Sequence, residues 1–174
     1  QPWSSVPQGL QNFDGIPFEV LAKLQLHGNV DARDNRLYSA RATGIAVQQR
    51  LVRLHLLHGA NISETNGRPI AALRLHYPGG ATHTLFISYG VHVRNWWKNR
   101  NESSSAVSDP NSSEVWTGRS VDADKSGATH RLYKTSFDLP PREQPVEGID
   151  ALSLFTKSWE SLGALTTGAR NGEV

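Results

Sequence analysis

Short β-rich segments separated by glycine or proline turns dominate the pattern of hydrophobic and polar positions. The clearest of them lie in the middle of the chain, at 51–58, 70–77, 82–90 and 91–97. Strands of this length, broken by turns at regular intervals, are typical of an antiparallel sheet. Within 51–58 the alternation predicts that Val52, Leu54, Leu56 and His58 face the core, because successive side chains of a strand point to opposite faces.

The flanking regions extend this pattern. After a polar lead-in at 1–11, an Asp-Gly turn precedes a predicted strand whose core face carries Phe18, Val20, Ala22, Leu24 and Leu26. Polar residues without periodicity predict surface loops, of which the longest covers 98–114. The remaining predicted strands lie at 43–47, 115–118, 131–137, 146–158 and 162–167. No segment of convincing length has a helical period.

Roughly nine to eleven short strands predict an all-β protein, an antiparallel two-sheet β-sandwich of the jelly-roll type. The length of 174 residues suits one domain that spans 1–174. Because the chain begins at Gln1 without an initiator methionine, we expect it to be a processed product or part of a larger multidomain protein.

Composition excludes several classes of protein. With 37% hydrophobic and 20% charged residues and no apolar run of about 20 residues, neither global disorder nor a membrane-spanning helix is expected. Lys and Arg total 18 against 16 for Asp and Glu, without a basic tract, so nucleic acid is not an expected partner. The absence of cysteine excludes disulfides, thiolate metal sites and a cysteine nucleophile.

Eight short motifs occur in an order that resembles a known group of domains. They are Phe13-Asp-Gly-Ile-Pro-Phe18, Leu24-Gln-Leu-His-Gly28, Leu54-His-Leu-Leu-His-Gly59, Tyr77-Pro-Gly-Gly80, Tyr89-Gly-Val-His-Val-Arg-Asn-Trp-Trp97, Val115-Trp-Thr-Gly118, Arg131-Leu-Tyr-Lys-Thr135 and Ile149-Asp150. Together they resemble a family of extracytoplasmic bacterial domains of planctomycete and verrucomicrobial type, similar to galactose-binding-like jelly rolls. This chain has Asn95 where the resemblance leads one to expect aspartate.

The resemblance implies a carbohydrate-binding module of a secreted or cell-surface protein, with a polysaccharide or oligosaccharide as partner. Sugars stack on aromatic rings and hydrogen-bond to carboxylates, amides and guanidinium groups. His92, Arg94 and Trp96 alternate along the predicted strand 91–97 and would share a face, and Trp116 is a fourth candidate ligand residue. Strand geometry also predicts that one of the paired tryptophans 96 and 97 is in the core and the other is exposed or covered by the 98–114 loop. An equally weighted alternative is a solvated face on which Arg94 stacks on Trp96.

Metal binding has one weak candidate. Asp122-Ala-Asp124-Lys-Ser126-Gly127 matches the first half of a calcium loop, but Tyr133 occupies the twelfth position, where a glutamate belongs. An EF-hand is therefore not expected, and a solvated turn is the alternative. The resemblance to galactose-binding-like jelly rolls still implies a structural calcium, at Asp122 and Asp124 or at Asp31 and Asp34. The seven histidines show no zinc spacing.

Catalysis has no clear signature. Gly-x-Ser-x-Gly, a phosphate-binding loop and a dinucleotide fingerprint are all absent, and the carboxylates form no obvious pair. We therefore expect a non-catalytic carbohydrate-binding module. The alternatives are a structural or protein-interaction β-sandwich domain and, less favoured, a small polysaccharide-degrading enzyme.

Overall fold

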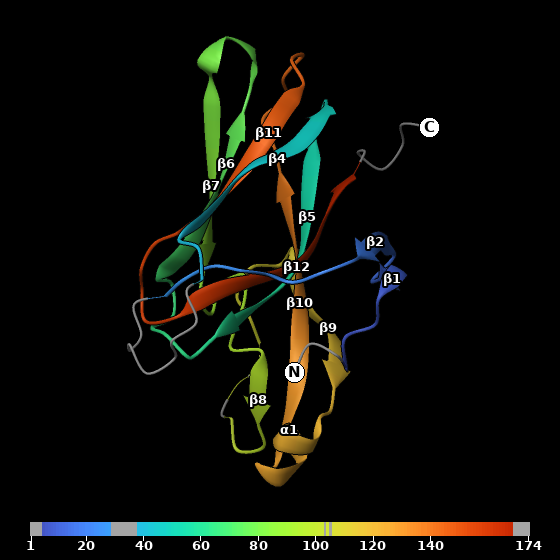
Figure 1. Cartoon of the computed structure of the whole chain (residues 1–174), viewed down its shortest axis with the longest axis vertical. Coiled ribbons are helices and arrows are strands. Elements are labelled where there is room, and N and C mark those ends of the chain that lie inside the picture. The colour runs from blue at the N-terminus through green and yellow to red at the C-terminus, as the bar shows by residue number, and fades with distance from the viewer. Residues whose placement is uncertain (1–4, 29–37, 103, 105, 169–174) are drawn as a thin grey trace.

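The computed structural model describes residues 5–28, 38–102, 104 and 106–168, and these residues form an all-β protein (Figure 1). Every pairing between its strands is antiparallel. Two sheets hold a hydrophobic core between them, which confirms the predicted antiparallel β-sandwich. The jelly-roll type of connection stays a prediction.

The two sheets differ in size. The larger one contains, in order, β3 (Leu24–Gln25), β12 (Trp159–Gly168), β5 (Arg53–Asn61), β10 (Ala128–Asp138) and β8 (Trp97–Asn99), and β9 (Ser112–Gly118) also pairs with β10. The smaller one contains β4 (Arg41–Gln49), β11 (Val146–Ser153), β6 (Pro69–His76) and β7 (Thr82–Ser88). A two-stranded hairpin, β1 (Gly9–Phe13) and β2 (Ile16–Val20), precedes both sheets. Two short helices, η2 (Pro78–Gly80) and α1 (Val121–Lys125), complete the described elements.

The central strand β5 is buried on both faces. Leu54 and Leu56 pack into the main core between the sheets, as the alternation predicted. Leu57 points the other way and is also fully buried, in a second cluster that includes residues of the β1–β2 hairpin. The alternation predicted burial of only one of these faces. The other face is buried because the β1–β2 hairpin covers it. Val52, predicted to be in the core, is only partly buried and lies just before the strand.

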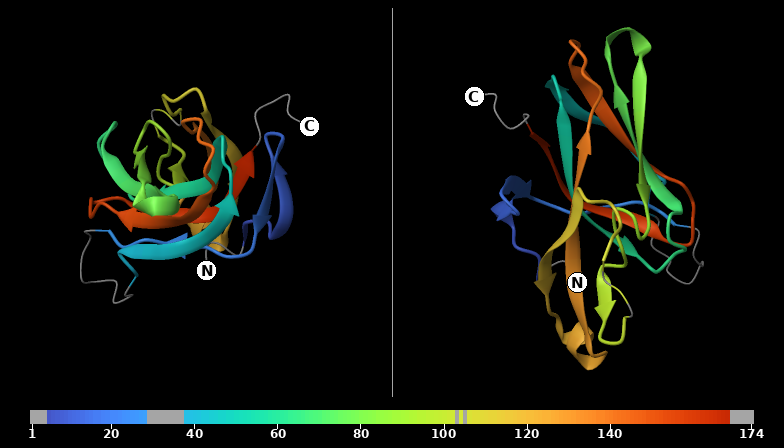
Figure 2. Two further views of the ribbon diagram at one scale, coloured as in Figure 1. Left: turned by 90° about the horizontal axis from the view of Figure 1, so that it is seen from above. Right: turned by 180° about the vertical axis from the view of Figure 1, so that it is seen from behind.

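The β1–β2 hairpin stands outside the two sheets (Figure 2). Asp14 and Gly15 have φ of 54° and 78°, the left-handed values that a two-residue type I′ turn requires, so the Asp-Gly turn is present. Phe18 and Val20 are buried as predicted, whereas Ala22 is exposed because the chain leaves the hairpin there. The predicted 1–11 lead-in is wrong at its end, since β1 begins at Gly9.

The lower end of the molecule in Figure 1 departs most from the sequence-based expectation. The predicted 98–114 loop is shorter, because β8 and β9 extend into it from both sides. The predicted strand at 91–97 is wrong: from 89 to 96 the chain makes turns and isolated bridges. Between β9 and β10 the chain forms α1, which is capped by Ser120, whose Oγ accepts a hydrogen bond from the Ala123 backbone N at 3.2 Å.

Candidate functional site

An irregular segment, residues 89–96, docks on the end of β5. The Ala60 backbone N donates to the Arg94 carbonyl at 3.1 Å, and the Trp96 backbone N donates to the Ala60 carbonyl at 2.7 Å. The neighbouring Gly59 permits this approach, because a Cβ there would lie 2.8 Å from the Trp96 Cβ. A residue without a side chain on β5 therefore sets where the 89–96 segment lies.

This docking creates a pocket of about 320 Å³ between three segments of the chain. Its lining is polar, with amides, carboxylates, hydroxyls, one guanidinium and two aromatic rings. The residues that line it are Ser63, Glu64, Asn66, Tyr89, Arg94, Asn95, Trp97, Asn99, Glu102 and Ser104. We refer to it as the Trp97 pocket. Concave sites in which several polar groups converge beside an aromatic ring are the usual places where small polar ligands bind.

A buried arginine beneath the Trp97 pocket positions two of its lining residues. Arg131, on β10, has a side chain with no solvent exposure. Its Nε donates to the Asn95 carbonyl at 2.8 Å, and its Nη2 donates to Glu102 Oε1 at 2.8 Å. Because burying a guanidinium is costly unless it is paired and hydrogen-bonded, these contacts tie Asn95 and Glu102 to a central strand.

A second carboxylate extends this network. Glu114, on β9, accepts from Lys98 Nζ at 2.9 and 3.1 Å through its two oxygens. Its Oε2 lies 3.7 Å from Arg131 Nη1, and within the described part of the chain this Nη1 has no hydrogen-bond partner. Glu102 and Glu114 are thus both engaged by cations, an arrangement that joins β8, β9 and β10.

The paired tryptophans have different environments. Trp96 is 6% exposed and its ring stacks on His130, with centroids 4.1 Å apart and planes 7° apart. Trp97 is partly exposed, meets His130 at an angle of 73° and lines the pocket. The prediction of Trp96 as the sugar-stacking ring does not fit this placement, because its ring is in the interior.

Of the three residues predicted to share a strand face, only Arg94 reaches the Trp97 pocket. Its Nε donates to the Ala106 carbonyl at 2.7 Å, and its guanidinium lies 5.7 Å from the centre of the Tyr89 ring instead of stacking on Trp96. His92 packs on Phe137, accepts a hydrogen bond from the Ser88 backbone N, and is absent from the pocket lining. Burial lowers its pKa. The three side chains diverge because 89–96 is not a strand.

The fourth predicted ligand residue, Trp116, lies elsewhere. It is on β9 and packs against the second hydrophobic cluster, next to the β1–β2 hairpin. Its ring also covers Gly118, where a Cβ would lie 2.2 Å from Trp116 Cη2. Trp116 therefore belongs to the packing of β9 and not to the Trp97 pocket.

The proposed calcium residues, Asp122 and Asp124, lie on α1 and are exposed. Asp124 accepts a hydrogen bond from Arg119 Nε at 2.7 Å. Across residues 5–28, 38–102, 104 and 106–168, no three histidine, aspartate or glutamate side chains come together as a metal site would require. Asp31 and Asp34 fall outside these described residues.

Sequence reasoning missed most of the Trp97 pocket. Trp97 was visible only as the partner of Trp96, and alternation could not decide which of the two is accessible. Asn95 was noted only as a departure from the motif and Glu102 carried no signal, because Arg131 holds them from positions 36 and 29 residues away in the chain.

Comparison with protein-family models, with curated proteins and with solved structures found no match to this chain. None of the helices in the described residues is both long and apolar enough to cross a membrane.

Proposed function

We propose that this chain is a non-catalytic carbohydrate-binding domain of a secreted or cell-surface protein, and that the Trp97 pocket binds the sugar. The observation that carries the proposal is the composition of this pocket. A partly exposed indole, the Arg94 guanidinium and the amides of Asn66 and Asn95 line one concavity. The motif resemblance to extracytoplasmic jelly rolls agrees with the proposal.

The chemistry of these groups suits a sugar. The C–H faces of a pyranose pack on aromatic rings, while its hydroxyls donate to carboxylates and amide oxygens and accept from guanidinium and amide N–H groups. A pocket of about 320 Å³ is open to a mono- or disaccharide portion of a longer chain. Because few groups are buried on binding, we expect affinities in about the micromolar to millimolar range.

The carboxylates of the pocket favour binding over hydrolysis. A general acid needs a raised pKa so that it carries a proton near neutral pH. The Thr65 backbone N–H donates to Glu64 Oε1 at 2.9 Å and lowers the pKa of Glu64, so this carboxylate is an acceptor. Glu102 is held in an ion pair with Arg131.

Affinity gel electrophoresis tests the proposal. The protein is run through gels that contain plant, algal or bacterial polysaccharides, with calcium and then with a chelator. We expect retardation by at least one polymer, and we expect Trp97→Ala and Arg94→Gln to remove it. Retardation that is present with calcium and is lost with the chelator would support the calcium prediction.

Two variants control for the loss of a positive charge and for the change of a tryptophan elsewhere in the protein. Arg74→Gln removes an exposed arginine from β6 of the other sheet, so it changes the net charge as Arg94→Gln does. Trp116→Phe changes a tryptophan outside the pocket. Both should be retarded as the wild type is. Equal retardation of the Trp97→Ala protein would contradict the assignment of this pocket.

The same samples separate the alternatives. A rise in reducing ends or in double bonds on incubation with a retarding polysaccharide would indicate a degrading enzyme. No retardation by any polymer, with the protein folded, would favour the structural or protein-interaction domain.

A further inference from the structure

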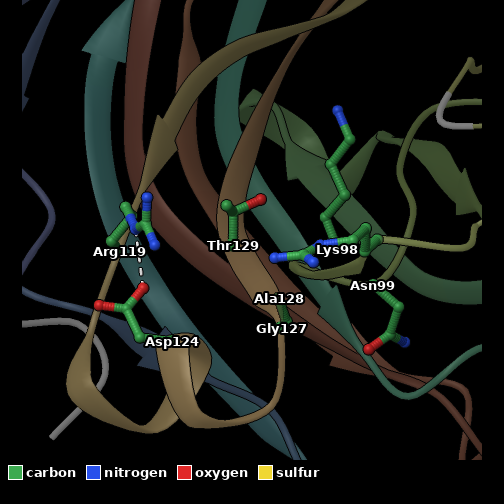
Figure 3. A pocket seen from close by; sticks show the side chains of 8 residues that line it. Lys98, Asn99, Arg119, Asp124, Gly127, Ala128 and Thr129 are labelled. Carbon is green, nitrogen blue, oxygen red and sulfur yellow. Dashed lines mark hydrogen bonds and ion pairs between the residues drawn. The ribbon is translucent and has the colours of Figure 1, made fainter.

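A second pocket, of about 220 Å³, lies between β8, the start of β10 and the α1 region. Its lining residues are Lys98, Asn99, Arg100, Arg119, Asp124, Gly127, Ala128 and Thr129. Figure 3 shows Arg119 and Asp124 on one side of it and Lys98 and Asn99 on the other, with Thr129 between them. We refer to it as the basic pocket.

Positive charge predominates in the basic pocket. Three of its residues are cationic, Lys98, Arg100 and Arg119, and one is anionic, Asp124. Lys98 is paired with Glu114 outside the lining. Arg100 is exposed, and among the described residues its guanidinium forms no ion pair. Even with the Glu114 charge included, the pocket keeps a positive excess.

The ion pair between Arg119 and Asp124, both of which line the basic pocket, is exposed. Their side chains are 72% and 47% exposed. A solvent-exposed pair of this kind contributes only about 0–1 kcal/mol, so an incoming anion can share the guanidinium at small cost. Two arginines that face one hollow offer the forked donors that carboxylate and sulfate groups accept.

The basic pocket adjoins the Trp97 pocket along β8. Asn99 lines both pockets, whereas Trp97 lines only the first and Lys98 only the second. Alternation of side chains along the strand separates Trp97 from Lys98, and Asn99, the last residue of β8, lies at the point that the two pockets share. One extended ligand that passes this end of β8 can therefore contact both pockets.

We propose that the ligand of this domain is a polysaccharide that carries carboxylate or sulfate groups. A sugar ring lies in the Trp97 pocket, and an anionic substituent on it or on the next residue lies in the basic pocket, near Arg100 and Arg119. This inference rests on the proposed carbohydrate-binding function. A nucleic acid is less favoured, because the cations form one small cluster without a basic tract.

Matched pairs of polymers test the inference by isothermal titration calorimetry. Dextran is compared with dextran sulfate, and polygalacturonate with its methyl ester, so that each pair differs mainly in the anionic group. We expect the anionic member of at least one pair to bind about tenfold or more tightly, equivalent to about 1.4 kcal/mol. The preference should shrink as salt rises above about 0.15 M, because ions screen exposed charges.

Two substitutions locate the preference. Arg100→Gln and Arg119→Gln should each weaken binding of the anionic polymer by about threefold to tenfold, and should leave binding of its neutral partner unchanged. Arg74→Gln, with the same change of charge on the other sheet, should have no effect. Near-ultraviolet circular dichroism checks that each variant keeps its fold, and both arginines are exposed, so their loss should not disturb it.

The outcomes distinguish the two proposals. Equal affinity for neutral and anionic polymers would overturn the anionic inference and leave the carbohydrate-binding function standing. No binding of any polysaccharide would overturn both. Equal affinity for double-stranded DNA, removed by the same substitutions, would show a general polyanion surface and would also overturn the inference. An anionic preference that is insensitive to Arg100 and Arg119 would overturn the assignment of the basic pocket.

Discussion

At the scale of single residues, buried polar side chains of β10 organise the end of the molecule that β8, β9 and α1 form. Arg131 ties Asn95 and Glu102 to β10, and His130, the preceding residue, stacks on Trp96. His130 has no solvent exposure, and its Nε2 is hydrogen-bonded to Ser120 Oγ at 2.8 Å. His130 and Arg131, adjacent on β10, thus hold Trp96 and the wall of the Trp97 pocket in place.

His130 should make the stability of the protein depend on pH. Burial lowers its pKa below the ordinary value of 6.5, as it also does for His55 and His92. The unfolded chain then binds protons that the native protein resists, so the stabilising contribution is complete above about pH 6.5 and is lost as pH falls towards the native pKa. We expect a lower free energy of unfolding in urea at about pH 5.5 than at about pH 7.5.

His130→Phe identifies the contribution of this residue, because phenylalanine keeps a ring against Trp96 and cannot take up a proton. The difference in unfolding free energy between the two pH values should be smaller than in the wild type. Histidines 55 and 92 should account for the part that remains. An unchanged difference in the variant would show that His130 does not titrate as its burial implies.

At the scale of elements, the contact between β5 and the 89–96 segment positions the Trp97 pocket. Gly59 lies against Trp96, and the φ of this glycine is not in the left-handed region, so only space requires glycine there. The clash that alanine would introduce is with Trp96 Cβ, close to the backbone, where little adjustment is available.

Gly59→Ala should therefore lower the free energy of unfolding by about 1–3 kcal/mol, the usual cost of overpacking a filled interior. Urea denaturation followed by tryptophan fluorescence measures it, because Trp96 is the residue displaced. Gly79→Ala, in the exposed turn of η2, provides a comparison in which a Cβ meets no atom within 4 Å but must adopt φ of 77°. Equal urea midpoints for wild type and Gly59→Ala would show that the segment can move away freely.

Elements with local signals could be predicted from sequence. The Asp-Gly turn, β10 and β12 were each visible from a few neighbouring residues. The 89–96 segment was not, because its conformation depends on hydrogen bonds to Ala60 on β5 and on the side chain of Arg131. The sequence singled out Arg94, which lines the Trp97 pocket, but could not choose Trp97 over Trp96, because that choice is made by these distant contacts.

At the scale of the whole molecule, two hydrophobic clusters lie on opposite faces of the larger sheet. The main core fills the space between the sheets, and the second lies under the β1–β2 hairpin, where Phe18 and Val20 meet Leu57 and Leu132. Leucines at both parities of β5, Leu54 and Leu56 at one and Leu57 at the other, were a signal of burial on both faces. Alternation alone did not show it, because nothing in the sequence paired the hairpin with this strand.

Phe18→Ala tests whether the hairpin is part of the cooperative fold. Phe18 has no solvent exposure, so the substitution should lower the free energy of unfolding by about 3–5 kcal/mol. Leu10→Ala, in the same hairpin at 77% exposure, should change it by less than about 0.5 kcal/mol. A Phe18→Ala protein with an unchanged urea midpoint would mean that the hairpin detaches without weakening the two sheets.

Binding of carbohydrate in the Trp97 pocket can be followed through the indole N–H signals of the five tryptophans. Tryptophan-to-phenylalanine variants assign the signals in a ¹⁵N–¹H spectrum, and the polysaccharide that retards the protein, cut to short oligosaccharides, is then added. We expect the Trp97 signal to shift with ligand concentration while those of the buried Trp96 and of Trp116 move little or not at all. A titration that shifts Trp116 and leaves Trp97 unchanged would contradict binding in this pocket.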